Sequence, residues 1–405
     1  MAKFALRTYG GAEAVDWGEK INIPRMRVER LARAQKYLKK NGIAACLLER
    51  NENMRYVTST KAIDFIDQLR YVIGFADYDP IIYEIPPGKL FANCPWVKPE
   101  NLRLAIVWAD EACGRAATWE RAQKFARLVK QDLKEKGLDK EKLGVDKLDD
   151  PGRQALKEAG IETVDVMPAM LEARAVKTED EINCLKMAVS IAEVGWYALY
   201  ETLKPGVFIR DLVAVANAAM YKAGAEYVWG VLVGPGDRIV HVGDVVTVDF
   251  CRISYMGYNT CYYRNIIVGR KPNDHERDMH KRSYERVYNV IDAIKPGVST
   301  AEVAKYWLPC KERGYPTEEY GWCEDLAHGI GLWLYEYPTI NRLWSFDYPM
   351  TLEKGMTMAV EAMEFDPGVG RTKLEEMIVV TDGGVEIMTK LPVKDMMIAS
   401  PILTD

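Results

Sequence analysis

The sequence lacks the features that mark several large classes of protein. Its 54 basic and 59 acidic residues leave a net charge of −5, and no run rich in Lys and Arg stands out. Nothing in it therefore favours binding to nucleic acid or to an anionic membrane surface. No apolar run approaches the roughly 18 residues of a membrane-spanning helix. The first residues include no apolar stretch typical of a secretory signal, so we expect a cytoplasmic protein.

Disulfide-type and zinc-type cysteine patterns are also missing. The eight cysteines include no CxxC pair. In a chain without a secretory leader, this pattern indicates reduced thiols rather than a disulfide framework or a structural zinc site. Most of the cysteines are expected to be small buried side chains. Cys251 and Cys261 need a further explanation, because they stand near a lone acid, Asp249, in an otherwise apolar strand.

Helix-like and strand-like segments alternate in the first part of the chain. Residues 25–41 have helical periodicity and precede an apolar strand at 43–49. Two later helices, at 118–137 and 153–160, each precede a short strand. The 405 residues are enough for two or three domains. Because helices and strands alternate in this part, we predict that residues 1–170 form an α/β domain with a mixed or parallel sheet.

From residue 171 onward, long helices are grouped around antiparallel strands. Thr178 and Glu181 have the spacing of a capping box and predict the start of a helix. The sequence KPGV closes two of the helices, at 204–207 and 295–298, which hints at an internal duplication. We predict an α+β domain over residues 171–405, with helices near 178–204, 209–224 and 273–294 and strands within 245–268, 356–365 and 373–389.

Six segments of the second domain carry a resemblance to a known family. They stand in the order GDVVTVDF, GYNTCYYRNIIVG, IKPGVS, HGIGLWLYEYP, LEKGMTMAVEA and KLEEMIVVTDGG. In this order and spacing they resemble the creatinase/prolidase/methionine aminopeptidase family, whose fold is called pita-bread. The first domain is similar to the smaller domain of the creatinase and aminopeptidase P branch. The resemblance implies an α/β N-terminal domain and an α+β pita-bread domain with a curved antiparallel sheet.

The same resemblance implies a metal site. Metal-dependent members hold two divalent ions with two Asp, one His and two Glu, hard ligands that suit ions able to activate water. Four of these positions are Asp249, His328, Glu361 and Glu375, and Cys261 stands where the second Asp is expected. Because that bridging acid is replaced, we expect one divalent ion per subunit (Mn, Fe or Zn). Its ligands would be the histidine and the two glutamates, with the thiol as a further candidate.

Several positions depart from the peptidases of the family. Tyr335 replaces a second His, and a substrate-contacting segment is missing before Gly243. Asp249 and Cys261 are 12 residues apart, one more than the common peptidase interval. A dimethylsulfoniopropionate-lyase branch has a similar layout, but it has acids in place of Cys251 and Cys261. That activity is therefore not carried over to this chain.

These departures favour a small-molecule substrate. We predict a metal-dependent hydrolase that cleaves a C–N bond of an amide or amine. Asp249 would complete the metal shell or act as a base, and Tyr335 and Arg264 would stabilise developing negative charge. Four alternatives remain open: an Xaa-Pro dipeptidase, a metal-free creatinase-like amidinohydrolase, a lyase on the same fold, and a non-catalytic binding protein.

The remaining expectations concern neighbours and partners. His275 and His280 lie in a charged helix and are expected in solvent. Glu364 and Glu376 should point away from the metal ligands, because side chains alternate along a strand. The resemblance implies a homodimer, and the departures from the peptidases favour a small-molecule substrate. Nucleic acid and membrane are not expected partners.

Overall fold

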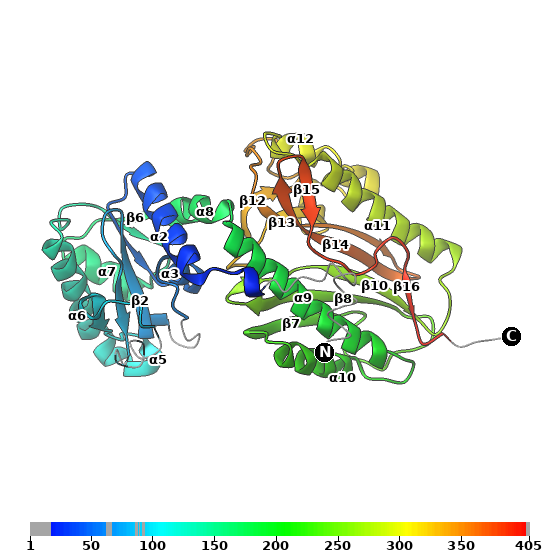
Figure 1. Ribbon diagram of the computed structural model, residues 1–405, viewed down its shortest axis with the longest axis horizontal. Coiled ribbons are helices and arrows are strands. Elements are labelled where there is room, and N and C mark those ends of the chain that lie inside the picture. The colour runs from blue at the N-terminus through cyan, green and yellow to red at the C-terminus, as the bar shows by residue number, and fades with distance from the viewer. Residues whose placement is uncertain (1–17, 62–66, 86–87, 89, 91–93, 402–405) are drawn as a thin grey trace. The chain divides into compact units, whose positions relative to one another are not determined.

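The computed structural model describes residues 18–401 except 62–66, 86–87, 89 and 91–93. The described chain divides into two compact units, one of residues 23–174 and one of residues 18–22 with 175–401 (Figure 1). The first unit therefore ends at Arg174, and a short segment that precedes it groups with the second unit. Along the described ranges, none of the helices has the length and apolarity needed to cross a lipid bilayer.

The unit of residues 23–174 is built on a six-stranded mixed sheet with strand order β4-β3-β2-β1-β5-β6. Strand β1 pairs antiparallel with β2 and parallel with β5. Its core includes Trp108 stacked on Phe125, with ring centroids 4.0 Å apart. The strands are β1 (Ala45–Leu48), β2 (Arg70–Phe75), β3 (Ile81–Glu84), β4 (Leu102–Leu104), β5 (Leu143–Val145) and β6 (Thr163–Asp165), and the helices are α2 (Ile23–Lys40), α3 (Asn51–Thr58), α5 (Asp110–Cys113), α6 (Arg115–Glu135), α7 (Asp150–Glu158) and α8 (Met167–Ala175).

The second unit contains two five-stranded sheets. One has the order β16-β10-β8-β7, with β9 paired to β8, and the other has the order β12-β11-β13-β14-β15. All their pairings are antiparallel except that of β10 with β16. The first sheet consists of β7 (Tyr227–Val233), β8 (Val245–Tyr255), β9 (Tyr258–Asn259), β10 (Tyr263–Val268) and β16 (Met397–Ala399), and the second of β11 (Asp325–Gly329), β12 (Glu336–Ile340), β13 (Thr357–Asp366), β14 (Gly370–Thr381) and β15 (Gly384–Ile387).

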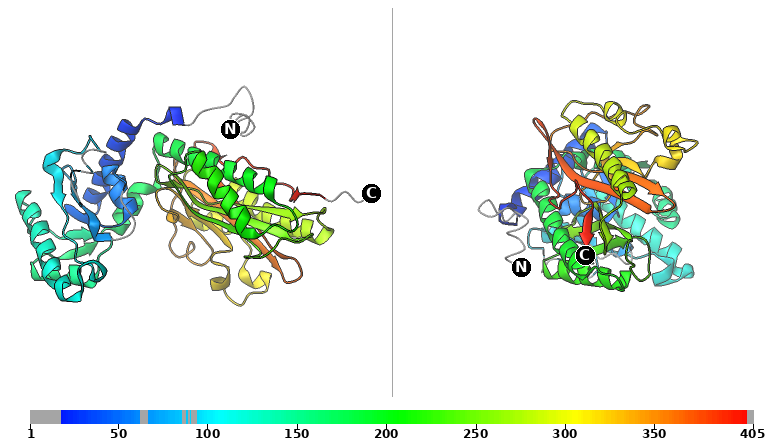
Figure 2. Two further views of the ribbon diagram at one scale, coloured as in Figure 1. Left: turned by 90° about the horizontal axis from the view of Figure 1, so that it is seen from below. Right: turned by 90° about the vertical axis from the view of Figure 1, so that its right-hand side faces the viewer.

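Helices cover both sheets of this unit. Helices α9 (Glu179–Thr202) and α10 (Ile209–Lys222) pack on β8 and β7, and α11 (Asp274–Ala293) packs on β13 and β14, with α12 (Thr300–Ala304) following it. The right-hand view of Figure 2 shows the green helices and the yellow-green helix on opposite sides of the strands. The predicted fold class, an α/β domain followed by an α+β pita-bread domain, is confirmed.

The start of α9 is capped as the sequence predicts. The Thr178 side chain accepts a hydrogen bond from Glu181 N (3.3 Å), and Glu181 Oε2 accepts one from Thr178 N (2.8 Å). The other carboxylate oxygen of Glu181 accepts a hydrogen bond from the Tyr258 hydroxyl (2.8 Å). The helix start is therefore tied to the β8–β9 hairpin.

The two KPGV turns make the same backbone hydrogen bonds. Gly206 N donates to Val240 O, and Gly297 N donates to Leu352 O, both at 2.8 Å. In return, Val240 N donates to Val207 O, and Leu352 N donates to Val298 O, both at 2.9 Å. Each helix and turn thus docks in the same way on the segment that leads into the next long strand, which supports the internal duplication suggested by the sequence.

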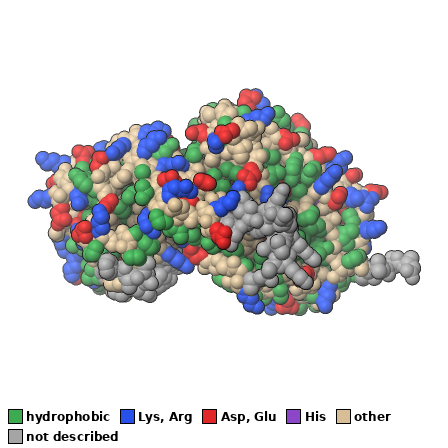
Figure 3. Space-filling view, viewed as in Figure 1, with side chains coloured by type: hydrophobic (Ala, Val, Ile, Leu, Met, Phe, Trp, Pro, Cys, Tyr) green, Lys and Arg blue, Asp and Glu red, His purple; other side chains and the backbone are tan. Residues whose placement is uncertain are grey.

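The surface carries charges of both signs. On the face shown in Figure 3, the Lys and Arg side chains alternate with Asp and Glu side chains rather than forming one large field. This pattern agrees with the small net charge of −5.

Candidate active site

The two sheets of the second unit meet along β10 and β14. Lys373 N donates to Asn265 Oδ1 (3.0 Å), and Arg264 Nη1 donates to Glu375 O (2.8 Å). One sheet brings Asp249 and Cys261 to this seam, and the other brings His328, Glu361 and Glu375, so the five residues that the resemblance assigns to the metal site lie at one place. Each of these five side chains is at most 5% exposed.

One cluster at the seam combines a carboxylate with two thiols. Ligand atoms of Asp249, Cys251 and Cys261 lie within 4.8 Å of one another. Cys261 Sγ is 4.0 Å from Asp249 Oδ1. Asp249 is directly opposite Tyr263 in the β8–β10 pairing, so their side chains share one face of the sheet. Both thiols are free rather than joined in a disulfide.

The second cluster shares the thiol of Cys261. Its sulfur lies within 4.8 Å of ligand atoms of His328 and Glu375. His328 Nε2 is 3.6 Å from Glu375 Oε1, which is an ion-pair contact and too long for a hydrogen bond. Both carboxylate oxygens of Glu375 are shielded from solvent and have no hydrogen-bond partner within the described ranges. An unsatisfied buried carboxylate is costly, so a positive charge beside it, on a protonated His328 or on a bound ion, would stabilise it.

Glu361 already has a cationic partner. The Lys373 ammonium lies 2.8 Å from Glu361 Oε2 and 4.6 Å from the centre of the Tyr263 ring. Sequence reasoning missed Lys373, although it stands two residues before Glu375 on β14 and therefore shares its face. Glu361 is thus paired with Lys373, whereas the sequence prediction placed its carboxylate on a metal ion together with His328 and Glu375.

The pKa values follow from burial and from the crowding of acids. Burial, and then the charge of Glu375, raise the pKa of Asp249 above its usual value. Burial also raises the pKa of Glu361 to about 7, although the Lys373 ammonium opposes this shift. For His328, burial acts to lower the pKa, but the Glu375 carboxylate outweighs it and the pKa is raised.

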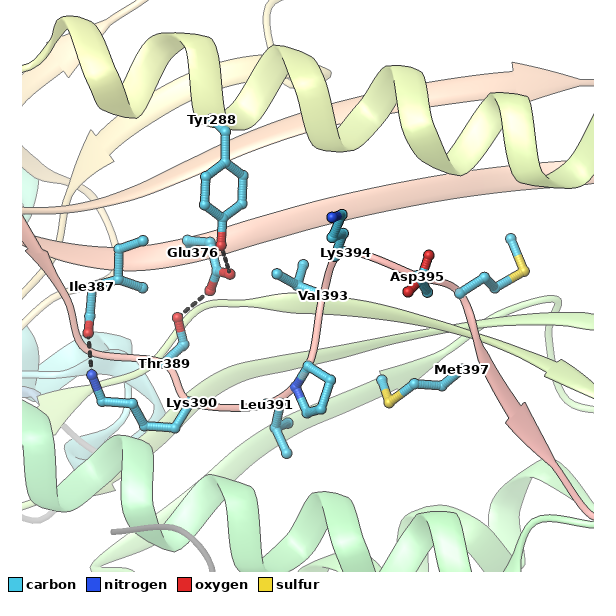
Figure 4. A pocket seen from close by; sticks show the side chains of 12 residues that line it. Tyr288, Glu376, Ile387, Thr389, Lys390, Leu391, Val393, Lys394, Asp395 and Met397 are labelled. Atoms are coloured by element: carbon cyan, nitrogen blue, oxygen red, sulfur yellow. Dashed lines mark hydrogen bonds between the residues drawn. The ribbon is translucent and has the colours of Figure 1, made fainter. Parts of the chain in front are cut away.

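Arg264 does not face the cluster, which corrects its expected placement. Its Nη2 pairs with Glu376 Oε2 (2.8 Å) and also donates to Leu391 O (3.3 Å), on the opposite face of β10 and β14. The Glu376 carboxylate accepts further hydrogen bonds from Tyr288 (3.0 Å) and Thr389, as Figure 4 shows. These two side chains therefore hold the two sheets together, and Arg264 is not placed to stabilise charge at the site.

The cavity in Figure 4 lies on this same side of β14. Its volume is about 520 Å³, and it is bounded by Tyr288, Glu376 and the segment 387–397. The predicted outward direction of Glu376 is confirmed by these contacts. Glu364 also points away from the cluster and pairs with Arg286 (2.7 Å).

Tyr335 stands at the outer edge of the site. Its ring centroid is 4.4 Å from that of His328, and 44% of the side chain is exposed. Burial of the rest, together with the nearby charge of Glu361, raises the pKa of Tyr335. The phenol therefore stays protonated at neutral pH and is able to donate a hydrogen bond at the mouth of the cluster.

A β-bulge interrupts β8 just after Cys251. Arg252 N donates to Thr260 O (2.7 Å), while Thr260 N donates to Ile253 O (3.1 Å), so two residues of β8 face one on the returning strand. Arg252 has a φ of +54°, in the left-handed region, which costs about 1–2 kcal/mol for a residue with a side chain. The bulge accounts for the extra residue between Asp249 and Cys261.

The residues at the seam have the side-chain chemistry to hold a divalent ion. The unsatisfied carboxylate of Glu375, the His328 imidazole and the Cys261 thiol converge within one short radius. Asp249 is close enough to Cys261 to complete the set. A mixed set of thiolate, imidazole and carboxylate suits zinc or iron(II) better than magnesium or calcium.

Comparison with known proteins agrees with this geometry. Residues 183–382 match the model of metallopeptidase family M24. Among curated proteins, the Xaa-Pro dipeptidase of Pyrococcus furiosus is 28% identical over 234 residues, 54% of this chain and 64% of the relative. The dimethylsulfoniopropionate lyase DddP of Roseovarius nubinhibens is 30% identical over 294 residues, 67% of this chain and 64% of the relative. The chain thus covers just under two thirds of the length of these curated relatives.

Solved structures show the same fold over nearly the whole chain. The Xaa-Pro dipeptidase from Bacillus anthracis superposes with a TM-score of 0.72 at 24% identity, covering 92% of this chain and 99% of that one. The prolidase from Pyrococcus horikoshii OT3 gives a TM-score of 0.71 at 21% identity, covering 91% and 100%. The fold and the buried seam of acids, histidine and thiols define a pita-bread protein with a metal-site arrangement. The family match and the shared fold support a relationship to the creatinase/prolidase pita-bread family.

Proposed function

We propose that this protein is a metal-dependent hydrolase that cleaves a C–N bond of a small molecule with one divalent ion per subunit. The observation that carries the proposal is the buried Glu375 carboxylate, which has no hydrogen-bond partner in the described chain and faces His328 and Cys261. In the proposed site, Cys261, His328 and Glu375 hold the ion, and Asp249 completes its shell or acts as a base. Glu361 joins the ligands only if it releases Lys373.

When bound, the ion would polarise the scissile carbonyl and acidify a water molecule. The chain's own groups have distinct tasks around it. Asp249, whose carboxylate lies 4.0 Å from Cys261 Sγ, accepts a proton from the attacking water. The Tyr335 hydroxyl, at the edge beside His328, donates a hydrogen bond to the developing oxyanion. The ion pair with Glu361 holds the Lys373 ammonium in place beside the cluster.

The test is the metal content of anaerobically purified protein together with hydrolysis of a panel of small amides, including Xaa-Pro dipeptides. We expect about one Mn, Fe or Zn ion per subunit, loss of turnover on chelation, and recovery when metal is returned. His328→Ala should lower metal occupancy and reduce turnover by more than about 100-fold. Loss of a residue that only positions a metal ligand already lowers metal affinity or activity by about 10–100-fold, and His328 is proposed as a ligand itself.

His275→Ala is the matched control. That histidine is half exposed and pairs with Asp366 at 3.2 Å, outside the cluster, so its loss should leave metal content and turnover unchanged. Full turnover by metal-stripped protein would contradict the proposal and favour a metal-free creatinase-like reaction. Two ions per subunit would contradict the single-ion site.

A lyase reaction is the second candidate. It is favoured by the match to the dimethylsulfoniopropionate lyase, which spans 67% of this chain against 54% for the dipeptidase. Incubation with dimethylsulfoniopropionate, followed by NMR, distinguishes the two reactions. Dimerisation and a cytoplasmic location stay predictions, and size-exclusion chromatography with light scattering tests the first.

A further inference from the structure

Arg252 is a charged side chain without a charged partner at the edge of the candidate site. It follows Cys251 in β8 and is partly buried. No carboxylate in the described ranges pairs with it, and its Nε is shielded from solvent without a hydrogen-bond partner. Other buried arginines of this unit differ, since Arg264 and Arg286 each pair with a carboxylate.

Three aromatic rings surround the Arg252 guanidinium. Its central carbon lies 4.4 Å from the ring centre of Trp333, 5.5 Å from that of Trp229 and 5.7 Å from that of Tyr227. These rings come from β7 and from the loop between β11 and β12. Trp229 is 62% exposed, so the cage opens to solvent on that side. Aromatic faces orient a guanidinium but offer no strong acceptor for its N–H groups.

The cage is held in place by hydrogen bonds around it. Trp333 N donates to Glu336 Oε1 (3.0 Å), and Glu336 in turn pairs with the buried Lys177 (2.9 Å). Tyr227 donates to Asn259 Oδ1 (2.6 Å), and the Asn259 side-chain amide donates to Gly331 O (3.0 Å). The loop that carries Trp333 is thus fixed to the β8–β9 hairpin. A preformed cage of this kind loses little ordering entropy on binding a ligand.

The cage and the metal-ligand cluster share their neighbours. Cys251, beside Arg252, belongs to the cluster with Asp249 and Cys261. On the other side, Tyr335 stands two residues after Trp333, and its ring contacts His328. The cage is therefore joined to the cluster by two short chain segments, Cys251–Arg252 and Trp333–Tyr335. The left-handed backbone at the bulge aims this side chain, and such local strain is often retained where function requires it.

We propose that Arg252, framed by Tyr227, Trp229 and Trp333, binds a carboxylate of the substrate and so selects small molecules that carry an acid group near the bond that is cleaved. A guanidinium offers two parallel N–H donors that match a planar carboxylate, and the aromatic rings restrict the acceptor to the plane of that fork. The inference rests on the proposed function only in placing the reaction at the metal-ligand cluster.

The first experiment measures binding alone. Tryptophan fluorescence of the metal-loaded protein is titrated with propionate and with propionamide, which differ only in the acid group. We expect saturable quenching or enhancement with propionate and at least tenfold weaker binding of propionamide. Arg252→Met should abolish the difference, and Arg252→Lys, which keeps the charge but loses the fork, should weaken propionate binding to an intermediate degree. Equal binding of both probes to the unaltered protein would overturn the proposal.

The second experiment uses turnover of an acid and its amide, alanyl-proline and alanyl-prolinamide. Arg252→Met should raise KM for the acid at least tenfold, with a smaller change in kcat and little change for the amide. Arg210→Met is the control, because Arg210 also stacks on an aromatic ring, Phe208 (4.8 Å), but has a carboxylate partner in Asp237. A loss of stability in Arg252→Met with unchanged KM would show a structural cation–π role and overturn the proposal.

The two experiments separate this inference from the proposed hydrolysis. Propionate binding that depends on Arg252, without cleavage of any amide, would leave the carboxylate site standing and reject the hydrolase. Cleavage of the acid and the amide with equal KM would reject the carboxylate site and leave the hydrolase standing.

Discussion

Glu375 and Glu376 are neighbours on β14, yet they occupy opposite faces of the strand with opposite surroundings. Glu376 is satisfied by Arg264, Tyr288 and Thr389, all of which hold it in one geometry. Glu375 is equally buried, but its carboxylate has no hydrogen-bond partner among the residues described, and it faces His328 and Cys261. Burial alone therefore does not distinguish a structural acid from a functional one. The distinction lies in whether the surrounding chain completes the hydrogen bonds of the acid or leaves them open.

The largest expected effect comes from replacing Glu375, the buried acid without a hydrogen-bond partner among the described residues. Glu375→Gln should reduce metal occupancy and turnover by more than about 100-fold, because a ligand and not only its support is lost. In the metal-free protein the substitution also removes the carboxylate that His328 contacts at 3.6 Å, so thermal stability should fall. Metal analysis, turnover and thermal melts after chelation check the three parts. A variant that binds metal normally would break the comparison.

The next largest effect comes from replacing Glu376, the buried acid that binds Arg264, Tyr288 and Thr389. Glu376→Ala leaves the guanidinium of Arg264 buried without its carboxylate, which should cost about 3–5 kcal/mol of stability. This loss corresponds to roughly 10 °C in Tm for a unit of this size. Calorimetry of the metal-free protein measures it. A melting temperature equal to that of the parent would show that the Arg264–Glu376 pair contributes nothing.

The smallest effect concerns a second acid on the Glu376 side, Glu193 in α9. It is 1% exposed, and Glu193 Oε1 accepts a hydrogen bond from Lys390 N (2.6 Å). Burial raises the pKa of Glu193 from 4.5 to about 7. Between these two pH values the folded state binds more protons than the unfolded state, so stability should fall as pH rises through this window. The total is at most about 3.4 kcal/mol, from about 2.5 pKa units at 1.36 kcal/mol per unit.

Glu193→Gln provides the measurement. The amide keeps an acceptor for Lys390 N but does not ionise, so this variant should lose part of the pH dependence and should exceed the parent in stability at pH 8. Urea midpoints of the metal-free proteins at pH 5 and pH 8 test the difference. An identical pH slope in parent and variant would contradict the raised pKa.

Much of the site followed from the sequence because its signals are local. The glycine-rich HGIG turn, the apolar strands around single acids, and the alternation that turns Glu364 and Glu376 away from the ligands are all readable over a few residues. The strands then bring Asp249, His328 and Glu375 together, since each lies near the seam of the two sheets. The roles of these residues stay predictions until metal and activity are measured.

What the sequence did not reveal depends on contacts between distant segments. His280 was expected in solvent, which is wrong: it is 4% exposed, because its Nε2 meets Val393 O (2.9 Å) more than 100 residues away. Arg264 was expected at the site but pairs with Glu376 on the other face. The position of Lys373 could have been inferred from strand alternation. The bulge at Arg252 could not have been inferred. The sequence shows one extra residue between Asp249 and Cys261, but it does not show at which position the strand bulges.

The contact between Lys177 and Glu336 has a practical consequence for anyone shortening the chain. The match to the peptidase family begins at residue 183, which makes that position a tempting place to cut. A chain starting there would lose the cation that neutralises Glu336 and the Thr178 cap of α9. Glu336 holds the backbone of Trp333, so the damage would reach the mouth of the site from a residue that the family match omits. A chain that begins at residue 183 should therefore be less stable than one that keeps Lys177 and Thr178.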